Sequence, residues 1–493
     1  MTTQDVITPP RPVTSHATAT RSEAPPRSVI RAMAISMVAT LMVMLDTTVV
    51  NVSLSATTAR FGSMGSVQWV LTSYLLALCA TMTASAWVID RLGPRLTFIA
   101  SMTMFLIGSV MCALSDSVWQ LVTGRTISGA GAGILVPTAS VLLIRGIPRE
   151  QLGRVQALNG SVQLIAPLIG PTVGGLLVDM CGGWPAIYWA NVPVALVLLI
   201  EAVRVDPDEP HTAKRRLDAL GLVCGSTAIV LTVLGVSLFG RTSRNTTFLL
   251  TIGALAVLAW AFFITHIRRA TNPLLDVSLY QNPVYSWSSF NVAVLGFGLY
   301  APMVVMPLYL EATRHLTAVH TGLVMSVAGV GVIMAGILCT KIMGRIGGGL
   351  TMTVGITLSI IATLPLVRLT NHTSYILLAV CLALRGAGIS LTIVPAMTRA
   401  FESIKRTAMA DASAQLNLLQ RIGGTIATAV IIAVIHHEAM LTRGLSPTVF
   451  SHANVWILTA TAVTLLPAFA LAKAERQKQD FFAPRGTPSS PLL

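Results

Sequence analysis

Only four charged residues lie well inside long apolar stretches of this 493-residue chain, and they are the ones that could do chemistry there. Asp46 is the one carboxylate far from the end of such a stretch, and Arg125, Arg385 and Arg421 are the basic residues. A charge in apolar surroundings is costly unless it is paired or functional. An acid paired with an arginine could respond to a proton, because protonation of the acid would break the ion pair and release the arginine.

Helix geometry suggests which two of these residues meet. In a helix over residues 32–54, Asp46 lies about 14 residues from the start, roughly 21 Å along and about 9 Å from the far side of a ~30 Å bilayer core. In a helix over 119–144 of opposite direction, Arg125 lies about 6 residues in, again roughly 9 Å deep. The shared level predicts an ion pair that acts as a proton switch. A static pair that only fixes helix packing is the alternative.

The composition shows what surrounds these residues. Of all residues 54% are hydrophobic and 11% are charged, whereas soluble domains carry about 25% charged residues. The apolar runs are about twenty residues long and do not alternate, which indicates spanning helices and excludes a transmembrane barrel. The net charge is +14, and the basic residues lie between the apolar runs. This distribution favours basic loops over a nucleic-acid-binding face.

Fourteen apolar stretches qualify as spans. They cover residues 32–54, 69–89, 96–115, 119–144, 155–178, 184–203, 218–239, 247–267, 285–309, 319–340, 349–369, 374–397, 414–436 and 453–472. With a cytoplasmic N-terminus, the inner segments hold about 24 basic residues and the outer loops about 6. Since an excess of Lys and Arg marks cytoplasmic loops, we expect both termini to lie in the cytoplasm.

An internal repeat indicates two related halves. The sequence GAGAGILVP at 129–137 has a counterpart in GAGISLTIVP at 386–395, and each follows a lone arginine. The loop around Gly93 has a weaker counterpart at Gly344. Two repeated halves that rock about a central site are a common design for secondary transporters.

Four motifs in the expected order resemble those of the major facilitator superfamily. They are LDTTVVNVSL at 45–54, AWVIDRLGPR at 86–95, Arg125 followed by Gly129, and GPTVGG at 170–175. The last is similar to the antiporter motif, and with fourteen spans the resemblance is to the drug:proton antiporter branch typified by the EmrB and QacA exporters. In that family, an arginine at the position of Arg125 is thought to take part in proton transfer near the acid of the first helix.

The resemblance implies an all-α integral membrane protein with the major facilitator fold. Its 14 transmembrane helices would form two pseudo-symmetric six-helix bundles plus two extra central helices, with both termini cytoplasmic. The implied organisation is a disordered tail over 1–31, an N-terminal bundle over 32–203, a linker with two helices over 204–284, a C-terminal bundle over 285–472 and a tail over 473–493.

The loop after the second span resembles the family's cytoplasmic gate. Its residues would latch the closed state, with the acid interacting with the start of a second-half helix near Ala412, where the helix dipole favours an anion. The loop departs from the family pattern at two positions: Ala86 stands where the family usually has Gly, and Pro94 stands where a second basic residue is common. The carried-over gate residues are Asp90, Arg91, Gly93 and Arg95.

The fifth expected helix carries the antiporter motif. Its small residues and proline would let the helix bend and pack closely against a neighbour; generic packing of small residues is the alternative. The residues concerned are Gly170, Pro171, Gly174 and Gly175.

Other polar or aromatic residues within spans are candidates for substrate contacts, although such residues more often bond neighbouring helices. These candidates are Tyr74, Gln163, Asn291, Tyr300, Arg385, Gln415 and Asn417. Arg421 either faces the cavity or reaches the cytoplasmic surface. The group His436, His437 and Glu438 is interpreted as part of a solvated outer loop.

The sequence favours a proton-coupled exporter of the multidrug type that works by alternating access; a proton-coupled importer or facilitator on the same fold is the alternative. HExxH, GxSxG and GxxxxGKS motifs are absent, so we expect neither an enzyme, nor a metal site or cofactor, nor an ATP-driven pump. The expected partners are membrane lipid, protons and a small amphipathic or apolar substrate, with no nucleic acid. We expect a monomer in a cell membrane, a bacterial inner or plasma membrane, and the substrate stays open.

Overall fold

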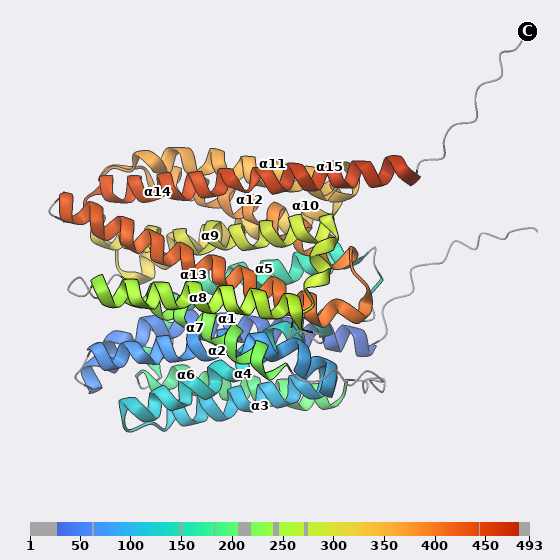
Figure 1. Cartoon of the computed structure of the whole chain (residues 1–493). Helices are drawn as coiled ribbons and strands as arrows, with labels where there is room; N and C mark the ends of the chain where they lie inside the picture. The colour runs from blue at the N-terminus through green and yellow to red at the C-terminus, as the bar shows by residue number, and fades with distance from the viewer. Residues whose placement is uncertain are drawn as a thin grey trace, which may run out of the picture.

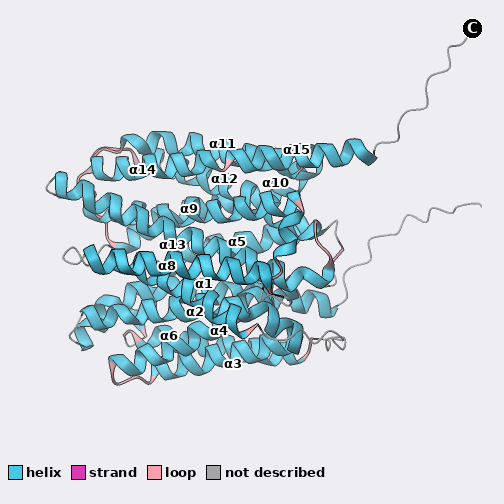
Figure 2. Cartoon of the chain, viewed as in Figure 1, coloured by secondary structure: helices cyan, strands magenta, loops and turns pink. Residues whose placement is uncertain are grey.

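The computed structural model describes residues 27–61, 64–145, 147–148, 151–181, 183–205, 218–239, 246–270, 275–442 and 444–482. Within these ranges the chain is helical and contains no strand (Figure 2). The α-helices are α1 (Arg27–Phe61), α2 (Met64–Leu92), α3 (Pro94–Ala113), α4 (Val118–Ile144), α5 (Leu152–Met180), α6 (Pro185–Val203), α7 (Ala219–Phe239), α8 (Thr246–Arg269), α9 (Pro283–Ala312), α10 (Ala318–Ile346), α11 (Gly348–Thr363), α12 (Tyr375–Glu402), α13 (Met409–Leu441), α14 (Pro447–Val463) and α15 (Leu465–Phe482). Short 3₁₀ turns are η2 (Val277–Gln281), η3 (Leu364–Arg368) and η4 (Arg406–Ala408).

Each of the fourteen expected spans coincides with a helix, but the count of fourteen is not confirmed. In the described part, twelve helical stretches are long and apolar enough to cross a membrane. A shorter apolar helical stretch, Ala219–Gly235, lies in α7, and α5 is not among the twelve. The last span is made of two helices, α14 and α15, that meet at Thr464. Pro467 in the first turn of α15 explains the break, because its ring nitrogen cannot donate to the carbonyl of Val463.

The ends of the chain differ partly from the expectation of unstructured tails. The helix α1 begins at Arg27, and α15 continues to Phe482. Residues 1–26 and 483–493 of the expected tails, and residues 206–217, 240–245 and 271–274 of the expected linker, lie outside the described residues.

The helices pack mainly in two groups (Figure 1). Helices α1 to α6 pack on one another, with α4 held between α2 and α3, and helices α9 to α15 form the second group, with α12 held between α10 and α11. The groups touch where α5 meets α10 and α12, and where α13 meets α2 and α4. The pair α7 and α8 lies outside both groups, and α7 contacts α2 and α13. We call the groups the first half and the second half.

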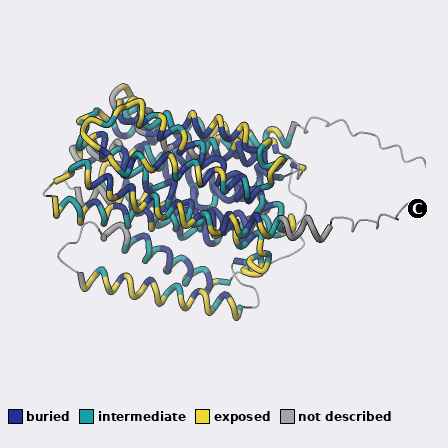
Figure 3. The backbone as a smooth tube through the Cα atoms, turned by 90° about the horizontal axis from the view of Figure 1, so that it is seen from above, coloured by how far each residue is buried: buried dark blue, intermediate teal, exposed yellow. Residues whose placement is uncertain are grey.

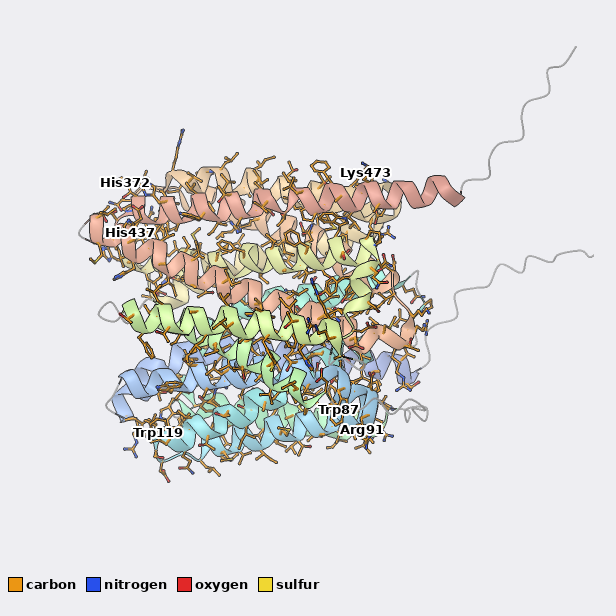
Figure 4. All side chains as sticks on the ribbon, in the orientation of Figure 1. Trp87, Arg91, Trp119, His372, His437 and Lys473 are labelled. Carbon is orange, nitrogen blue, oxygen red and sulfur yellow. The ribbon has the colours of Figure 1, made fainter. Side chains whose placement is uncertain are left out.

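The two ends of the bundle differ in charge. Figure 4 places Arg91 and Lys473 at one end and Trp119, His372 and His437 at the other. Most described basic residues belong to the first of these ends, which we call the basic end: Arg31, Arg91, Arg95, Arg145, Arg154, Arg204, Arg268, Arg269, Lys341, Arg345, Arg399, Lys405, Arg406 and Lys473. Arg60, Arg314 and Arg368 belong to the opposite end. The charge rule predicts that the basic end is cytoplasmic.

The apolar core also differs between the ends. At the basic end one cluster joins both halves, since Leu143 and Ile147 of the first half are buried with Phe401 and Leu416 of the second. At the opposite end each half has a cluster of its own within the described residues. Figure 3 shows buried residues in the interior of the bundle and exposed ones along its rim. The halves are therefore joined by apolar packing at the basic end, and their clusters stay separate at the other.

Candidate functional site

Asp46 and Arg125 form an ion pair inside the first half. Arg125 Nη1 donates to Asp46 Oδ2 at 2.7 Å, and both side chains are only 1% exposed. The helices run in opposite directions, so the fixed rise per residue brings an acid late in α1 and a basic residue early in α4 to the same depth. The geometric expectation from the sequence is met, and the two side chains face each other.

Further groups complete the surroundings of the pair. Asn191 Nδ2 donates to Asp46 Oδ1 at 2.9 Å, so a neutral amide from α6 shares the carboxylate with the arginine. Arg125 Nε donates to the carbonyl of Val70 at 3.4 Å, and its guanidinium lies 3.8 Å from the centroid of the Tyr74 ring. The ring face attracts the cation. If the acid is protonated, the arginine thus keeps two partners.

Close helix packing fixes this geometry. A Cβ at Gly129 would collide with the backbone carbonyl of Tyr74, and one at Gly133 with that of Leu78. Only glycine therefore lets α4 approach α2 closely enough to place Arg125 over the Tyr74 ring. The tyrosine hydroxyl has no hydrogen-bond partner among the residues that the structure describes, so the ring is the part of this side chain that acts on the pair.

Sequence reasoning missed Asn191 and Tyr188. The Tyr188 ring lies 5.9 Å from the Arg125 guanidinium on the side of α6. Asn191 could have been noticed in the sequence because it is a polar residue in the middle of an apolar span. The sequence alone did not show which of several such residues faces Asp46.

Arg421 of α13 reaches across to the first half. Its Nη2 lies 3.3 Å from the sulfur of Met44, two residues before Asp46. The side chain is half-buried. Of the two sequence interpretations, contact with the interior of the bundle is the one that matches this position.

The expected gate loop is short and tightly turned. The helix α2 ends at Leu92, Gly93 adopts φ 82°, and Pro94 starts α3. This left-handed conformation favours glycine, and proline suits the first helical turn. Arg95 donates to the carbonyls of Ala202 and Val203 at the end of α6, so it ties two helices of the first half together.

Arg91 is exposed, and Asp90 is half-buried at the end of α2. The helix α13, whose start was expected to contact Asp90, begins at Met409. Its first turn already contains an acid, Asp411. Asp411 Oδ1 accepts from the backbone N–H of Asp276 at 3.2 Å. The contact of Asp90 with the region of Ala412 stays a prediction.

A direct hydrogen bond joins the halves at the basic end. Ser413 Oγ of α13 donates to the carbonyl of Pro137 in α4 at 3.0 Å. At the same end, Gly153 of α5 faces the side chain of Met343 in α10. Polar and apolar contacts therefore close the same end.

Two of the four antiporter-motif residues pack α5 on α1. A Cβ at Gly170 would collide with the side chain of Thr48, and one at Gly174 would come 3.2 Å from the backbone of Val49. These neighbours follow Asp46 by two and three residues. No described atom lies within 4 Å of the corresponding point at Gly175, and Pro171 lies within α5.

A small polar pocket lies between the halves near the basic end. Gln156, Asn159 and Gln163 of α5 line it together with Ser140 of α4 and Asn417 of α13. Its apolar side consists of α12 residues. None of the described residues that line it is charged. The structure thus brings together two of the predicted cavity residues, Gln163 and Asn417, and adds Gln156 and Asn159 to them.

The other predicted cavity residues lie elsewhere. Tyr74 lies beneath Arg125, as described, and Tyr300 packs against Gly424 in the second half. Asn291 is fully buried and donates to the carbonyl of Thr464 at 3.4 Å. Gln415 accepts from the Tyr285 hydroxyl at 3.0 Å. Arg385 is enclosed in the second half.

The remaining titratable group of the sequence analysis lies at the opposite end. Glu438 pairs with His452 at 2.9 Å, and the histidine side chain is 57% exposed. His436 and His437 are exposed as well, but the three residues of the group lie in the last turns of α13 and not in a loop. No group of three or more metal-ligating side chains was found in the described part of the chain.

Comparison with known proteins decides the family. Residues 36–428 match the Major Facilitator Superfamily. The chain belongs to this superfamily. Members are membrane transporters and are generally not enzymes.

Relatives of this major facilitator chain include bacterial drug exporters. It is 30% identical over 445 residues to the "Multidrug resistance protein B homolog" of Mycobacterium tuberculosis, covering 89% of this chain and 80% of the relative. It is 28% identical over 430 residues to the "Multidrug export protein EmrB" of Haemophilus influenzae, covering 83% and 82%. Among solved structures, the human organic anion transporter MFSD10 (TETRAN) has the same fold, with a TM-score of 0.59, 15% identity, and coverage of 91% and 100%.

Proposed function

We propose that this major facilitator transporter is a proton-coupled exporter of the multidrug type, located in a bacterial plasma membrane. It exchanges protons for a small amphipathic or apolar molecule by alternating access, and a single chain is the transport unit. The names of the relatives support the substrate class, since two of them are called multidrug proteins. The observation that carries the proton coupling is the buried pair of Asp46 and Arg125.

The pair is suited to couple a proton to a conformational change. Leaving one member of a buried ion pair without its counter-charge costs about 3–5 kcal/mol. Protonation of Asp46 removes its charge, after which Arg125 retains the Val70 carbonyl and the Tyr74 ring. The free energy of this exchange is large enough to change which of two helix arrangements is preferred.

The packing of α5 offers a route from the pair to the other half. One end of α5 lies against Thr48 and Val49, directly after Asp46, through Gly170 and Gly174. Its other end lies against α10 and α12 of the second half. A shift of α1 on protonation would therefore move a helix that contacts both halves.

The test is substrate-induced proton release in inverted vesicles that contain a pH-sensitive dye. Wild-type protein is expected to release protons when an exported compound is added, and Asp46→Asn is expected to abolish the release while the protein remains folded in the membrane. Asp116→Asn is the matched control, because Asp116 is an exposed acid at the opposite end.

Normal proton release by the Asp46→Asn variant would contradict the proposed coupling. Export by wild-type protein without proton release, for every compound of a panel of cationic and neutral amphipathic molecules, would favour a facilitator instead.

A further inference from the structure

Arg385 is a buried arginine in the second half that has no acid beside it. Its side chain is 4% exposed. Nη1 donates to Thr363 Oγ1 at 3.0 Å and Nη2 donates to the carbonyl of Gly298 at 2.9 Å, whereas Nε has no hydrogen-bond partner in the described part of the chain. Among the described residues, no carboxylate lies within ion-pair distance of Arg385. An arginine cannot shed its proton to escape the cost of burial.

The two acceptors that hold this arginine are fixed by the local sequence. In a regular helix the Gly298 carbonyl would accept from residue 302, but Pro302 has no N–H, so this carbonyl is available to Arg385. Thr363, the last residue of α11, donates its hydroxyl hydrogen to the Ser359 carbonyl at 2.7 Å and accepts from the arginine with its oxygen. The guanidinium is thus held in place while part of its five donors stays unused.

The arginine borders a small pocket between α9, α11, α12 and α14. Besides Arg385, the polar residues that line the pocket are Ser359, Thr392, Thr461 and Thr464, and no acid is among them. The three threonine hydroxyls donate to carbonyls within their own chain segments, and each hydroxyl can rotate toward a new acceptor. The pocket has room for about one water-sized group.

The position of the charge makes an anion the fitting occupant. Arg385 lies ten residues into α12, about 15 Å from its start and therefore near the middle of a ~30 Å bilayer core. An isolated charge at this depth is strongly unfavourable, and a counter-charge with hydrogen-bond acceptors would offset its desolvation. A neutral ligand or a cation would leave the charge uncompensated.

We propose that this pocket binds one halide ion on Arg385. A halide fits a space for one water-sized group, and its single negative charge accepts hydrogen bonds from the guanidinium and the threonine hydroxyls. The anion gives the second half the counter-charge that Asp46 supplies in the first.

The experiment measures thermal unfolding of the purified full-length protein in detergent, by tryptophan fluorescence. Sodium chloride, sodium bromide or sodium acetate replaces sodium gluconate, a larger anion, at constant ionic strength. A ligand that binds only the folded protein raises the unfolding midpoint in a saturable manner. For wild-type protein we expect a saturable rise of about 2 °C or more.

The variant Arg385→Gln is expected to lose this rise and to fold normally in gluconate, because it removes an unpaired buried charge. Arg368→Gln is the matched control, since it removes the same charge from an exposed position in the same half and is expected to keep the rise. A bromide anomalous peak beside Arg385 in crystals of the wild-type protein gives evidence that does not depend on any variant.

A rise with chloride or bromide that requires Arg385 supports the halide site. A rise with acetate and not with either halide overturns it. No rise in the wild-type protein, or a rise that persists in Arg385→Gln, overturns the proposal. Because the measurement is an equilibrium on purified protein and involves no transport, its result is independent of the proposed proton coupling.

Discussion

The two halves of the molecule each bury an arginine in a glycine-rich helix, and the surroundings of these arginines differ. Arg125 in α4 has a carboxylate at 2.7 Å and an aromatic ring beneath it. Arg385 in α12 has a threonine, a backbone carbonyl and an unused Nε. Protonation of Asp46 can break the ion pair in the first half. Among the described residues, no acid is paired with Arg385 in the second half.

The glycines show why the arginines differ. A Cβ at Gly129 would collide with α2 and one at Gly131 with α3, while Gly386 and Gly388 have the same relation to α10 and α11. Gly129 and Gly386 are therefore equivalent positions. Arg125 lies four residues before Gly129, whereas Arg385 lies one residue before Gly386. The halves thus repeat the contacts between helices but not the position of the charge. Similar packing carries different chemistry.

Removal of the arginines tests this difference most strongly. Arg125→Met leaves the buried Asp46 without its counter-charge and is expected to lower the free energy of unfolding by about 3–5 kcal/mol. Arg385→Met removes an unpaired charge and is expected to be neutral or stabilising. Unfolding in mild detergent with gluconate as the anion measures both. Equal losses in the two variants would end the comparison.

Two asparagines, one in each half, sharpen the comparison. Asn191 of α6 donates to the charged Asp46, and Asn454 of α14 donates to the Phe450 carbonyl of its own helix at 2.9 Å. Asn191→Leu is expected to cost about 1.5–3 kcal/mol, the range for a bond to a charged group, and Asn454→Leu about 0.5–1.5 kcal/mol. The reverse order in the same unfolding assay would mean that the amide of Asn191 does not stabilise the carboxylate.

The glycines themselves should behave alike. Gly129→Ala and Gly386→Ala each force a Cβ against a backbone carbonyl of the neighbouring helix, so each is expected to cost about 1–3 kcal/mol. Gly175→Ala is the control, since no atom of the described part of the chain lies within 4 Å of its Cβ position. A loss in one half alone, measured by thermal unfolding, would show that the packing is not repeated.

The aromatic ring beneath Arg125 gives the smallest effect. Tyr74→Leu removes the ring and is expected to cost about 0.5–2 kcal/mol through the lost cation–π contact. Tyr74→Phe retains the ring and deletes a hydroxyl that has no partner, so it is expected to change stability by less than about 0.5 kcal/mol. If the two variants lose equal stability, the hydroxyl and not the ring is important.

The sequence predicted the features that depend on position along the helix axis. The rise per residue is fixed, so the common depth of Asp46 and Arg125 could be worked out, and the length and polarity of each apolar run indicated the helices. The direction of a side chain around the helix axis depends on packing between distant segments. For this reason Asn191 was missed, and Tyr74 was assigned to a cavity although it lies under the arginine.

The alignment of the repeat was also beyond sequence reasoning. Both arginines precede a GAG segment, which made Arg385 resemble a second Arg125. Only the contacts of Gly129 and Gly386 with their neighbouring helices show that the charges are three residues apart in register. The break at Thr464 was hidden for a similar reason, because an apolar run looks continuous even where the helix restarts.

The apolar cluster that joins the halves at the basic end gives the molecule a thermal signature. Burial of apolar surface near room temperature is driven by entropy and weakens on cooling. Separation of Leu143 and Ile147 from Phe401 and Leu416 would expose such surface to water. Cooling should therefore weaken the contact between the halves at the basic end first. The heat capacity of the protein should rise when the halves separate there.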